Sequence, residues 1–313
     1  GVEDKIERRG KMKKIINFTQ CRQIINKYGG ADTKKTIIYN DKYYLLKFPN
    51  SNPKQNKEAS YSNNIFSEYL GCHIFNDIGI KAQNTILGEF KLDNGIVKNV
   101  CACEDFTGNG WRLVEFQNLK NSFPETPSSS NGRTTALEEI LEVIEKHADI
   151  KNNEEVEKHF WDMFIVDALI GNYDRHNGNW GILVNDESEE MKIAPIYDCG
   201  SCLYSQLTDG QMKEILKSET EINNRVYNKP TSTITENGKR INYYEFIASL
   251  KNKECNDALL RIVNKIDMKQ IKKESDEMPI ISNIRRDFYK VILERRYEII
   301  LEKTYKKLIH QST

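Results

Sequence analysis

The chain has 313 residues, enough for one large domain or for two lobes with a cleft between them. Hydrophobic residues make up 38% of it and charged residues 29%, and 46 Lys and Arg balance 46 Asp and Glu. This balance excludes a general attraction to nucleic acid or to an anionic membrane, so we expect no clear nucleic-acid surface. No apolar run reaches the roughly 18 to 20 residues of a membrane span, so none is expected.

The seven cysteines indicate a reducing compartment rather than a disulfide framework, because their number is odd and most lie in apolar segments. A thiol protease is not expected, since the only histidine after the Cys-Gly-Ser-Cys run lies near the C-terminus. The cysteines are Cys21, Cys72, Cys101, Cys103, Cys199, Cys202 and Cys255.

Residues 12–105 are predicted to form a β-rich lobe with one helix. Two apolar runs, 36–39 and 43–48, flank a polar turn and predict a hairpin. A helical period follows in 62–78, with Gly79 as its C-terminal cap. Two further strands are expected at 85–90 and 96–103. The charged residues before Met12 lack a signal-peptide core, so 1–11 are interpreted as a tag or a disordered extension.

Residues 106–313 are predicted to form a larger, mainly helical lobe. Thr135 and Glu138 have the spacing of a helix-capping box. The segment 154–170 is apolar on most sides, which indicates a buried helix, and 284–308 has an amphipathic period. The expected fold class is therefore α+β, with a small β-rich N-lobe and a larger α-helical C-lobe.

A polar loop follows the expected buried helix and carries the residues with the clearest chemistry. Strand-like runs at 180–184 and 191–196 predict a hairpin, whose two open ends lie side by side. Asn179 precedes the first strand and Asp198 follows the second, so the hairpin is expected to bring both close to Asp174.

The side chains of Asp174, Asn179 and Asp198 offer the hard oxygens that Mg²⁺ prefers. Protein kinases carry a catalytic Asp, a metal-binding Asn five residues later, a short hairpin and then a metal-binding Asp. The same spacing occurs here. It predicts an ATP- and Mg²⁺-dependent phosphotransfer site, with Asp174 as the base and with Asn179 and Asp198 as metal ligands.

The β-rich lobe is expected to supply the remaining phosphate contacts. Lys47 lies within an apolar strand, where a buried lysine requires a partner, and Glu68 in the following helix is the candidate. The glycine loop at Gly29 and Gly30 precedes this strand, and its backbone N–H groups are candidates for covering the phosphates.

The run from Leu169 to Gly181, with its Asp-Arg-His loop, and the run from Ala194 to Asp198 resemble the two metal motifs of the HipA-like serine/threonine kinases. The resemblance covers nearly the whole chain after Met12. It implies that Lys47 contacts the ATP phosphates and that Glu104 and Phe106 offer backbone groups to adenine. It also implies a phosphate loop and further nucleotide contacts from Gly29, Gly30, Ala31, Glu68, His176 and Tyr197.

The same resemblance implies a protein substrate with a serine or threonine acceptor, autophosphorylation, and either a cytoplasmic location or secretion into a host cytosol. Two features of the family are not found. No serine lies between Cys21 and Lys47, where HipA carries a regulatory serine, and HipA's longer N-terminal module is not recognised. An antitoxin-type partner is therefore not expected.

Other interpretations remain open from the residues alone. A phosphoinositide kinase shares the Asp-Arg-His loop, although 201–211 lacks the Lys and Arg that would bind a lipid headgroup. A pseudokinase acting as a binding module would keep the fold without the reaction. In the alternative interpretation, Lys47 and Glu68 face solvent. His176 would, in its own alternative, only stabilise its loop. Asp162 and Asp167 in the buried helix either orient the loop or face solvent.

Overall fold

The structure, a computed structural model, describes residues 12–25, 34–49, 64–121 and 135–311. The chain divides into two compact units, each built from separate stretches of sequence. The first unit contains the described residues up to 106 together with 199–218 and 267–291. The second contains 107–198, 219–266 and the residues from 292 onward.

The first unit is built on a six-stranded sheet that is antiparallel except for the parallel pair β1–β5. A cluster of apolar side chains that includes Phe18, Ile37, Leu46 and Val100 packs on it. In spatial order the strands are β1 (Ile16–Asn17), β5 (Thr85–Lys91), β6 (Val97–Glu104), β4 (Lys42–Lys47), β3 (Lys34–Tyr39) and β2 (Gln23–Ile24).

Both predicted hairpins of this sheet are confirmed. β3 and β4 pair from Tyr39↔Lys42 outward, so the turn consists of Asn40 and Asp41 alone, and Lys42 belongs to the strand. Asn40 and Asp41 both have positive φ, at 48° and 62°, which Asn and Asp tolerate better than most residues. β5 and β6 pair from Thr85↔Cys103 to Lys91↔Val97.

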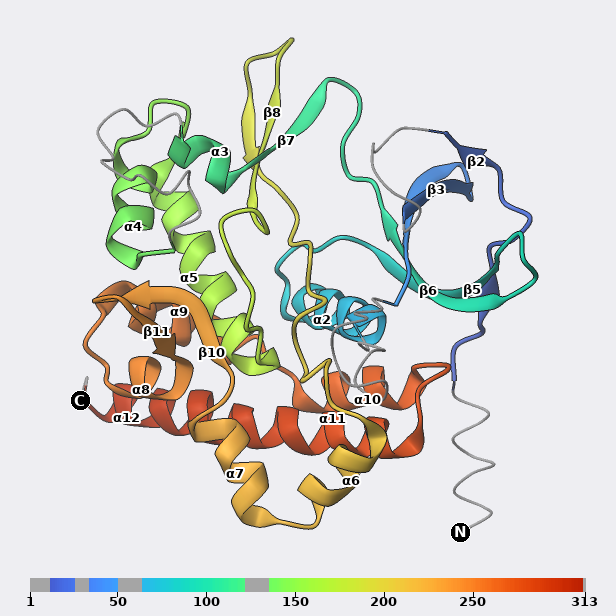
Figure 1. Cartoon of the computed structure of the whole chain (residues 1–313). Helices are drawn as coiled ribbons and strands as arrows, with labels where there is room; N and C mark the ends of the chain where they lie inside the picture. Colours follow the sequence, from blue (N-terminus) through green and yellow to red (C-terminus); the bar gives the residue numbers. More distant parts are fainter. Residues whose placement is uncertain (1–11, 26–33, 50–63, 122–134, 312–313) are drawn as a thin grey trace. The chain divides into compact units, whose positions relative to one another are not determined.

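The predicted helix is α2 (Asn64–Ile78), which packs on β5 and β6 (Figure 1). Gly79 caps it as expected, with φ of 93°, a value that favours glycine. The N–H of Gly79 donates to the Asn76 carbonyl and that of Ile80 to the Phe75 carbonyl, which is the Schellman pattern. This unit also holds α6 (Asp209–Leu216), α10 (Met268–Glu277) and most of α11 (Asn283–Arg296).

The second unit is organised around α5 (Asn153–Ile170), the predicted buried helix. Asn152 caps its N-terminus by accepting from the Glu155 N–H, and Gly171 ends it. Around it lie β7 (Trp111–Glu115), α3 (Phe116–Asn121), α4 (Leu137–Lys146), β8 (Gly181–Asn185), β9 (Met191–Ile193), α7 (Glu219–Tyr227), β10 (Thr231–Glu236), β11 (Lys239–Asn242), α8 (Tyr243–Ala248), α9 (Lys253–Val263), the π-helix η1 (Tyr297–Glu302) and α12 (Lys303–Gln311).

The predicted capping box at Thr135 is wrong. The N-cap of α4 is Ala136, and no side chain caps it. Thr135 is instead tied to β10, because its hydroxyl donates to the Thr233 carbonyl and its own carbonyl accepts from the Thr235 N–H. The hydrogen bond to Thr233, 98 residues away in the sequence, outweighs the local preference of Thr135 for the N-cap position of the helix. The hairpin β10–β11 was also not predicted.

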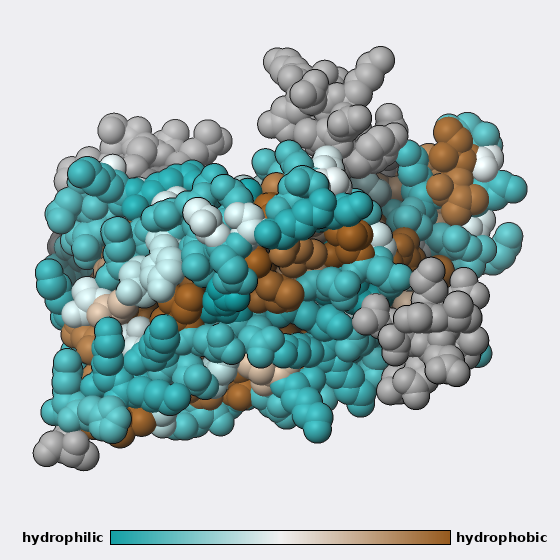
Figure 2. Space-filling view, turned by 90° about the horizontal axis from the view of Figure 1, so that it is seen from below, coloured by the Kyte–Doolittle hydropathy of each residue, from teal (hydrophilic) through white to brown (hydrophobic). Residues whose placement is uncertain are grey.

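The face drawn in Figure 2 is covered mainly by hydrophilic side chains, with apolar ones in smaller patches. No helix within the described ranges is long and apolar enough to cross a bilayer. All seven cysteines lie in the described part of the chain as thiols.

Candidate active site

The loop of residues 171–179 leaves α5 and is held by buried hydrogen bonds. Gly171 turns the chain out of the helix in the left-handed region, with φ of 65°. The buried Asn172 accepts from the Asp174 N–H through Oδ1 at 2.9 Å, while its carbonyl accepts from the Tyr243 hydroxyl at 2.6 Å. The backbone that leads to Asp174 is therefore fixed, yet the Asp174 side chain is 47% exposed and accessible to a substrate.

The side chain of Arg175 holds this loop in place through hydrogen bonds to Asp167 and to three backbone carbonyls. Its guanidinium is 1% exposed and binds both carboxylate oxygens of Asp167 in α5, Nε to Oδ2 at 3.0 Å and Nη2 to Oδ1 at 3.2 Å. Its Nη1 donates to the carbonyls of Asn179 at 2.9 Å, of Tyr197, and of Asp198 at 3.5 Å. One side chain thus links the loop to the segment after β9.

The predicted hairpin β8–β9 is confirmed, and its register places two candidate residues. Ile182 lies opposite Ile193, and the Ala194 N–H donates to the Gly181 carbonyl at 3.1 Å. Asn179 and Asp198 therefore leave the same end of the hairpin. Asp198 has φ of 54°, a left-handed conformation that a residue other than glycine adopts at a cost and that often marks functional sites.

The side-chain oxygens of this cluster are of the chemical type that could hold a magnesium ion. The buried Asn179 donates through Nδ2 to the Asp174 carbonyl, so its Oδ1 is the amide atom that remains to ligate a metal. Together with the Asp198 carboxylate it would offer a hard donor set, to which phosphate oxygens and water would add the remaining ligands. Among the described residues, no three His, Cys, Asp or Glu side chains form a metal-binding group by themselves.

His176 and Tyr197 shape the loop around these oxygens. The Nδ1 of His176 accepts from the Gly178 N–H at 3.0 Å, and its Nε2 lies 4.0 Å from Asp174 Oδ2. The Tyr197 hydroxyl donates to the Gly178 carbonyl at 3.1 Å. Both residues therefore have structural roles, while the His176 ring is 43% exposed and remains available to a ligand.

The first unit contains the expected lysine–glutamate pair. Lys47 Nζ in β4 donates to Glu68 Oε1 in α2 at 2.7 Å. The Glu68 side chain is 1% exposed and the Lys47 side chain 21%, so the carboxylate is buried and the lysine is only partly accessible. The solvent-facing alternative for Glu68 is therefore wrong.

The candidate adenine contacts also lie in the first unit. The Glu104 N–H donates to the Asn84 carbonyl at 2.9 Å, and its carbonyl accepts from Gln83 Nε2 at 2.8 Å. Those backbone groups of Glu104 are thus already used within the unit, and Phe106 follows at the end of this stretch. The phosphate-loop candidates Gly29, Gly30 and Ala31 lie outside the described residues.

Sequence reasoning missed the roles of two residues. Arg175 was read only as part of a motif, and Tyr243, 71 residues beyond its partner Asn172, was not considered. Asp167 does orient the loop, whereas Asp162 pairs with Arg261 at 2.7 Å. A carboxylate near the C-terminal end of a buried helix, followed eight residues later by an arginine, was the available signal for the Asp167–Arg175 pair.

The comparisons with known proteins decide the family. The model of the HipA-like C-terminal domain matches residues 27–270, which is more than half of the chain. The chain belongs to the HipA-like family. The serine/threonine-protein kinase CtkA of Helicobacter pylori strain J99 is 44% identical over 284 residues, which cover 90% of this chain and 85% of CtkA.

Solved structures agree with the family assignment. The crystal structure of the proinflammatory kinase CtkA of Helicobacter pylori matches with a TM-score of 0.89 and 42% identity, covering 96% of this chain and 99% of that one. A HipA from the HipA–HipB–operator DNA complex of Shewanella oneidensis MR-1 matches with a TM-score of 0.53, covering 98% of this chain and 73% of that one. At 13% identity the second match shows the fold alone.

These matches confirm the expected α+β kinase-like fold and the expected enzyme class, a HipA-like protein kinase. The narrower expectation of similarity to CtkA, based on the compact length and the Phe160–Phe164 run, is also confirmed.

Proposed function

We propose that this protein transfers the γ-phosphate of ATP, with Mg²⁺, to serine or threonine hydroxyls of a protein and that it phosphorylates itself. The observation that carries the proposal is the convergence of Asp174, Asn179 and Asp198 around the buried Arg175. The name of the relative CtkA, a serine/threonine-protein kinase, supports the choice of acceptor.

In this proposal Asp174 accepts or orients the proton of the attacking hydroxyl, for which its exposed carboxylate is suited. Asn179 Oδ1 and the Asp198 carboxylate hold the metal. When bound, Mg²⁺–ATP supplies the transferable phosphoryl group and neutralises the charge that develops on it. Arg175 keeps the two ligand-bearing segments in register, so that the oxygens do not need to reorganise during the reaction.

In the first unit, Lys47 is proposed to contact the ATP phosphates, with Glu68 fixing the direction of its ammonium group. Phe106 is proposed to contact adenine through its backbone, and Glu104 through its carbonyl, which can accept a second hydrogen bond beside the one from Gln83. His176 and Tyr197 are proposed to lie at the nucleotide site. Gly29, Gly30 and Ala31 are proposed to form the phosphate loop. Residues 12–105 and 106–313 would act as the two lobes, and the protein would work in a cytosol, either its own or that of a host cell.

Incubation with γ-labelled ATP and Mg²⁺ tests the proposal. We expect wild type to label itself and a serine-containing protein, and Asp174→Ala and Asp198→Ala to lose at least about 100-fold in rate. Asp93→Ala, in the exposed β5–β6 turn, is the matched control and should retain full activity. Equal labelling by wild type and Asp174→Ala would refute the role of that residue, and the absence of label on any protein or lipid would favour a pseudokinase.

A further inference from the structure

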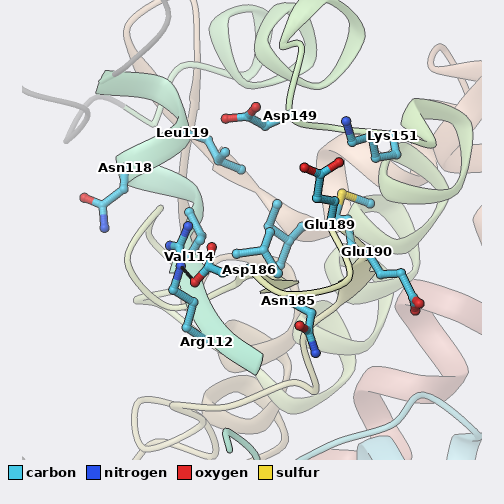
Figure 3. A pocket seen from close by; sticks show the side chains of 13 residues that line it. Arg112, Val114, Asn118, Leu119, Asp149, Lys151, Asn185, Asp186, Glu189 and Glu190 are labelled. Atoms are coloured by element: carbon cyan, nitrogen blue, oxygen red, sulfur yellow. Dashed lines mark hydrogen bonds and ion pairs between the residues drawn. The ribbon is translucent and has the colours of Figure 1, made fainter. Parts of the chain in front are cut away.

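A groove in the second unit has not been assigned a role. One face of the three-stranded sheet β7–β8–β9 forms the floor of a groove of about 650 Å³ (Figure 3). The register pairs Val114 with Ile182 and Val184 with Met191, so these side chains project from the same face. Ile182 is buried and the other three are half-buried, which makes the floor apolar.

Three separate elements form the walls of this groove. Leu119 of α3 stands on one side, and Asp149 and Lys151, from the connection between α4 and α5, stand on another. The turn between β8 and β9 closes the remaining side with Glu189 and Glu190. The groove therefore combines an apolar floor with a charged rim.

Acidic groups dominate the rim. Arg112 and Asp186 neutralise each other through an ion pair of 2.8 Å at one end of the groove. Among the other described residues that line the groove, three carry carboxylates, Asp149, Glu189 and Glu190, and one, Lys151, carries an ammonium group. In Figure 3, Glu189 points toward Asp149 and Lys151, while Glu190 extends away from them. This imbalance contrasts with the neutral chain as a whole.

We propose that this groove docks a segment of the protein substrate in which an apolar side chain is flanked by lysine or arginine. The inference rests on the proposed function, because it assumes a protein substrate. The apolar side chain would cover Val184 and Met191, and the flanking cations would meet Glu189 on one side and Asp149 on the other. The volume lies within the range of pockets that hold a few side chains.

The position of the groove fits docking at a distance from the acceptor hydroxyl. Its floor includes Val184 in β8, five residues beyond the candidate ligand Asn179. At about 3.3 Å per residue, the two are separated by up to roughly 16 Å along the strand. A segment docked there leaves the substrate chain several residues in which to reach Asp174.

Peptide binding tests the groove independently of catalysis. The probe is a short fluorescein-labelled peptide in which Leu and Lys alternate around one Ser, and its counterpart carries Glu in place of Lys. Fluorescence anisotropy should show binding of the basic peptide to wild type and about tenfold weaker binding to Glu189→Lys/Glu190→Lys and to Asp149→Lys. Glu236→Lys/Glu245→Lys carries the same charge change as the double variant outside the groove and should bind like wild type.

Phosphorylation of the same peptide separates the two proposals. The groove variants should raise the KM for the peptide about tenfold and leave both the KM for ATP and self-labelling unchanged, because the rim meets only the substrate. Equal binding by all variants, equal binding of the acidic peptide, or self-association that the Glu189→Lys/Glu190→Lys variant abolishes would overturn the docking proposal. Groove-dependent peptide binding without any phosphate transfer would instead uphold the groove and refute the proposed function.

Discussion

Asp167 and Arg175 form a bidentate ion pair that is almost fully buried, with N–O distances of 3.0 and 3.2 Å. Burial raises the pKa of Asp167, and the charge of Arg175 and its hydrogen bonds, with a further one from Asn172, oppose that rise. The pair joins α5 to a loop and, through the third guanidinium nitrogen, to the segment that carries Asp198.

Replacing Arg175 should therefore damage the reaction more than nucleotide binding. We expect Arg175→Lys to lower kcat roughly 100-fold, because a lysine provides a single ammonium group in place of the planar fork. Arg175→Ala should also cost about 3–5 kcal/mol in the free energy of unfolding, since Asp167 is left buried without its partner.

Urea unfolding and steady-state kinetics measure the two effects of these Arg175 variants. Millimolar guanidinium should partly restore kcat in Arg175→Ala, and the same salt should leave Asp174→Ala inactive. A purely structural role would give Arg175→Lys wild-type kcat with lowered stability.

The pair Lys47–Glu68 allows a separate test of nucleotide positioning. Lys47→Met should lower kcat/KM for ATP by about 100-fold or more, because the phosphates lose their ammonium contact. It should also lower stability by about 1–3 kcal/mol, since the Glu68 carboxylate is buried without its donor. Lys91→Met, at the exposed end of β5 in the same sheet, is the control and should behave like wild type.

A double variant distinguishes stability from activity at this pair. Lys47→Met/Glu68→Leu should recover most of the lost free energy of unfolding, because an apolar pair replaces a buried ion pair at little cost. It should remain as inactive as Lys47→Met. Recovery of kcat/KM together with stability would show that Lys47 does not contact ATP.

We expect protonation of His159 to lower the stability of the protein in acid. Burial, and next the positive charge of Arg175, lower its pKa to about 4 from the ordinary value of 6.5. Between pH 6.5 and pH 4, the unfolded chain binds a proton at His159 that the folded chain does not bind. The free energy of unfolding therefore keeps its full value above pH 6.5 and falls as the pH decreases from 6.5 through 4. His159 as a whole is half-buried rather than buried, so the loss should be about 1–3 kcal/mol.

The comparison with His159→Gln isolates this effect. The difference in free energy of unfolding between wild type and variant should shrink by that amount from pH 7 to pH 4. Asp77, whose pKa burial and Glu274 raise to about 7, acts in the opposite direction but is present in both proteins. A difference that is constant with pH would contradict the assignment to His159.

Gly71 of α2 permits a close approach within the first unit. A Cβ at this position would lie 2.7 Å from Cys199 Cβ and 3.0 Å from Cys202 Sγ. Gly71→Ala should therefore destabilise the protein by about 1–2 kcal/mol, although alanine is the better helix former. In a Cys199→Gly background the penalty should be smaller, and a double-mutant cycle on unfolding free energies measures the difference. Equal penalties would show that Cys199 is not the obstacle.

The sequence by itself determined the parts of this protein that depend on neighbours along the chain. Hydrophobic periodicity and turn chemistry predict four local features. These are the hairpin that carries Lys47, the cap at Gly79, the buried helix that ends at Gly171 and the β8–β9 hairpin. Because the two strands of a hairpin run antiparallel, the start of the first strand lies beside the end of the second. The predicted hairpin therefore placed Asn179 and Asp198 at the same end. The spacing of these motifs indicated a kinase-type site, and the resemblance of their residues to HipA-like kinases indicated the family.

Only the tertiary structure decided which distant polar groups meet. Thr135 has the spacing of a cap but bonds to β10, and β7 joins the hairpin to complete the floor of the groove. Glu68 was a candidate for Lys47, yet its burial became visible only in the packed unit. A buried charged side chain is stable only when an oppositely charged or hydrogen-bonding group lies next to it. Which group lies there depends on how whole helices and strands pack, not on local propensity. The pairing of Arg175 with Asp167 and with three backbone carbonyls is of this kind.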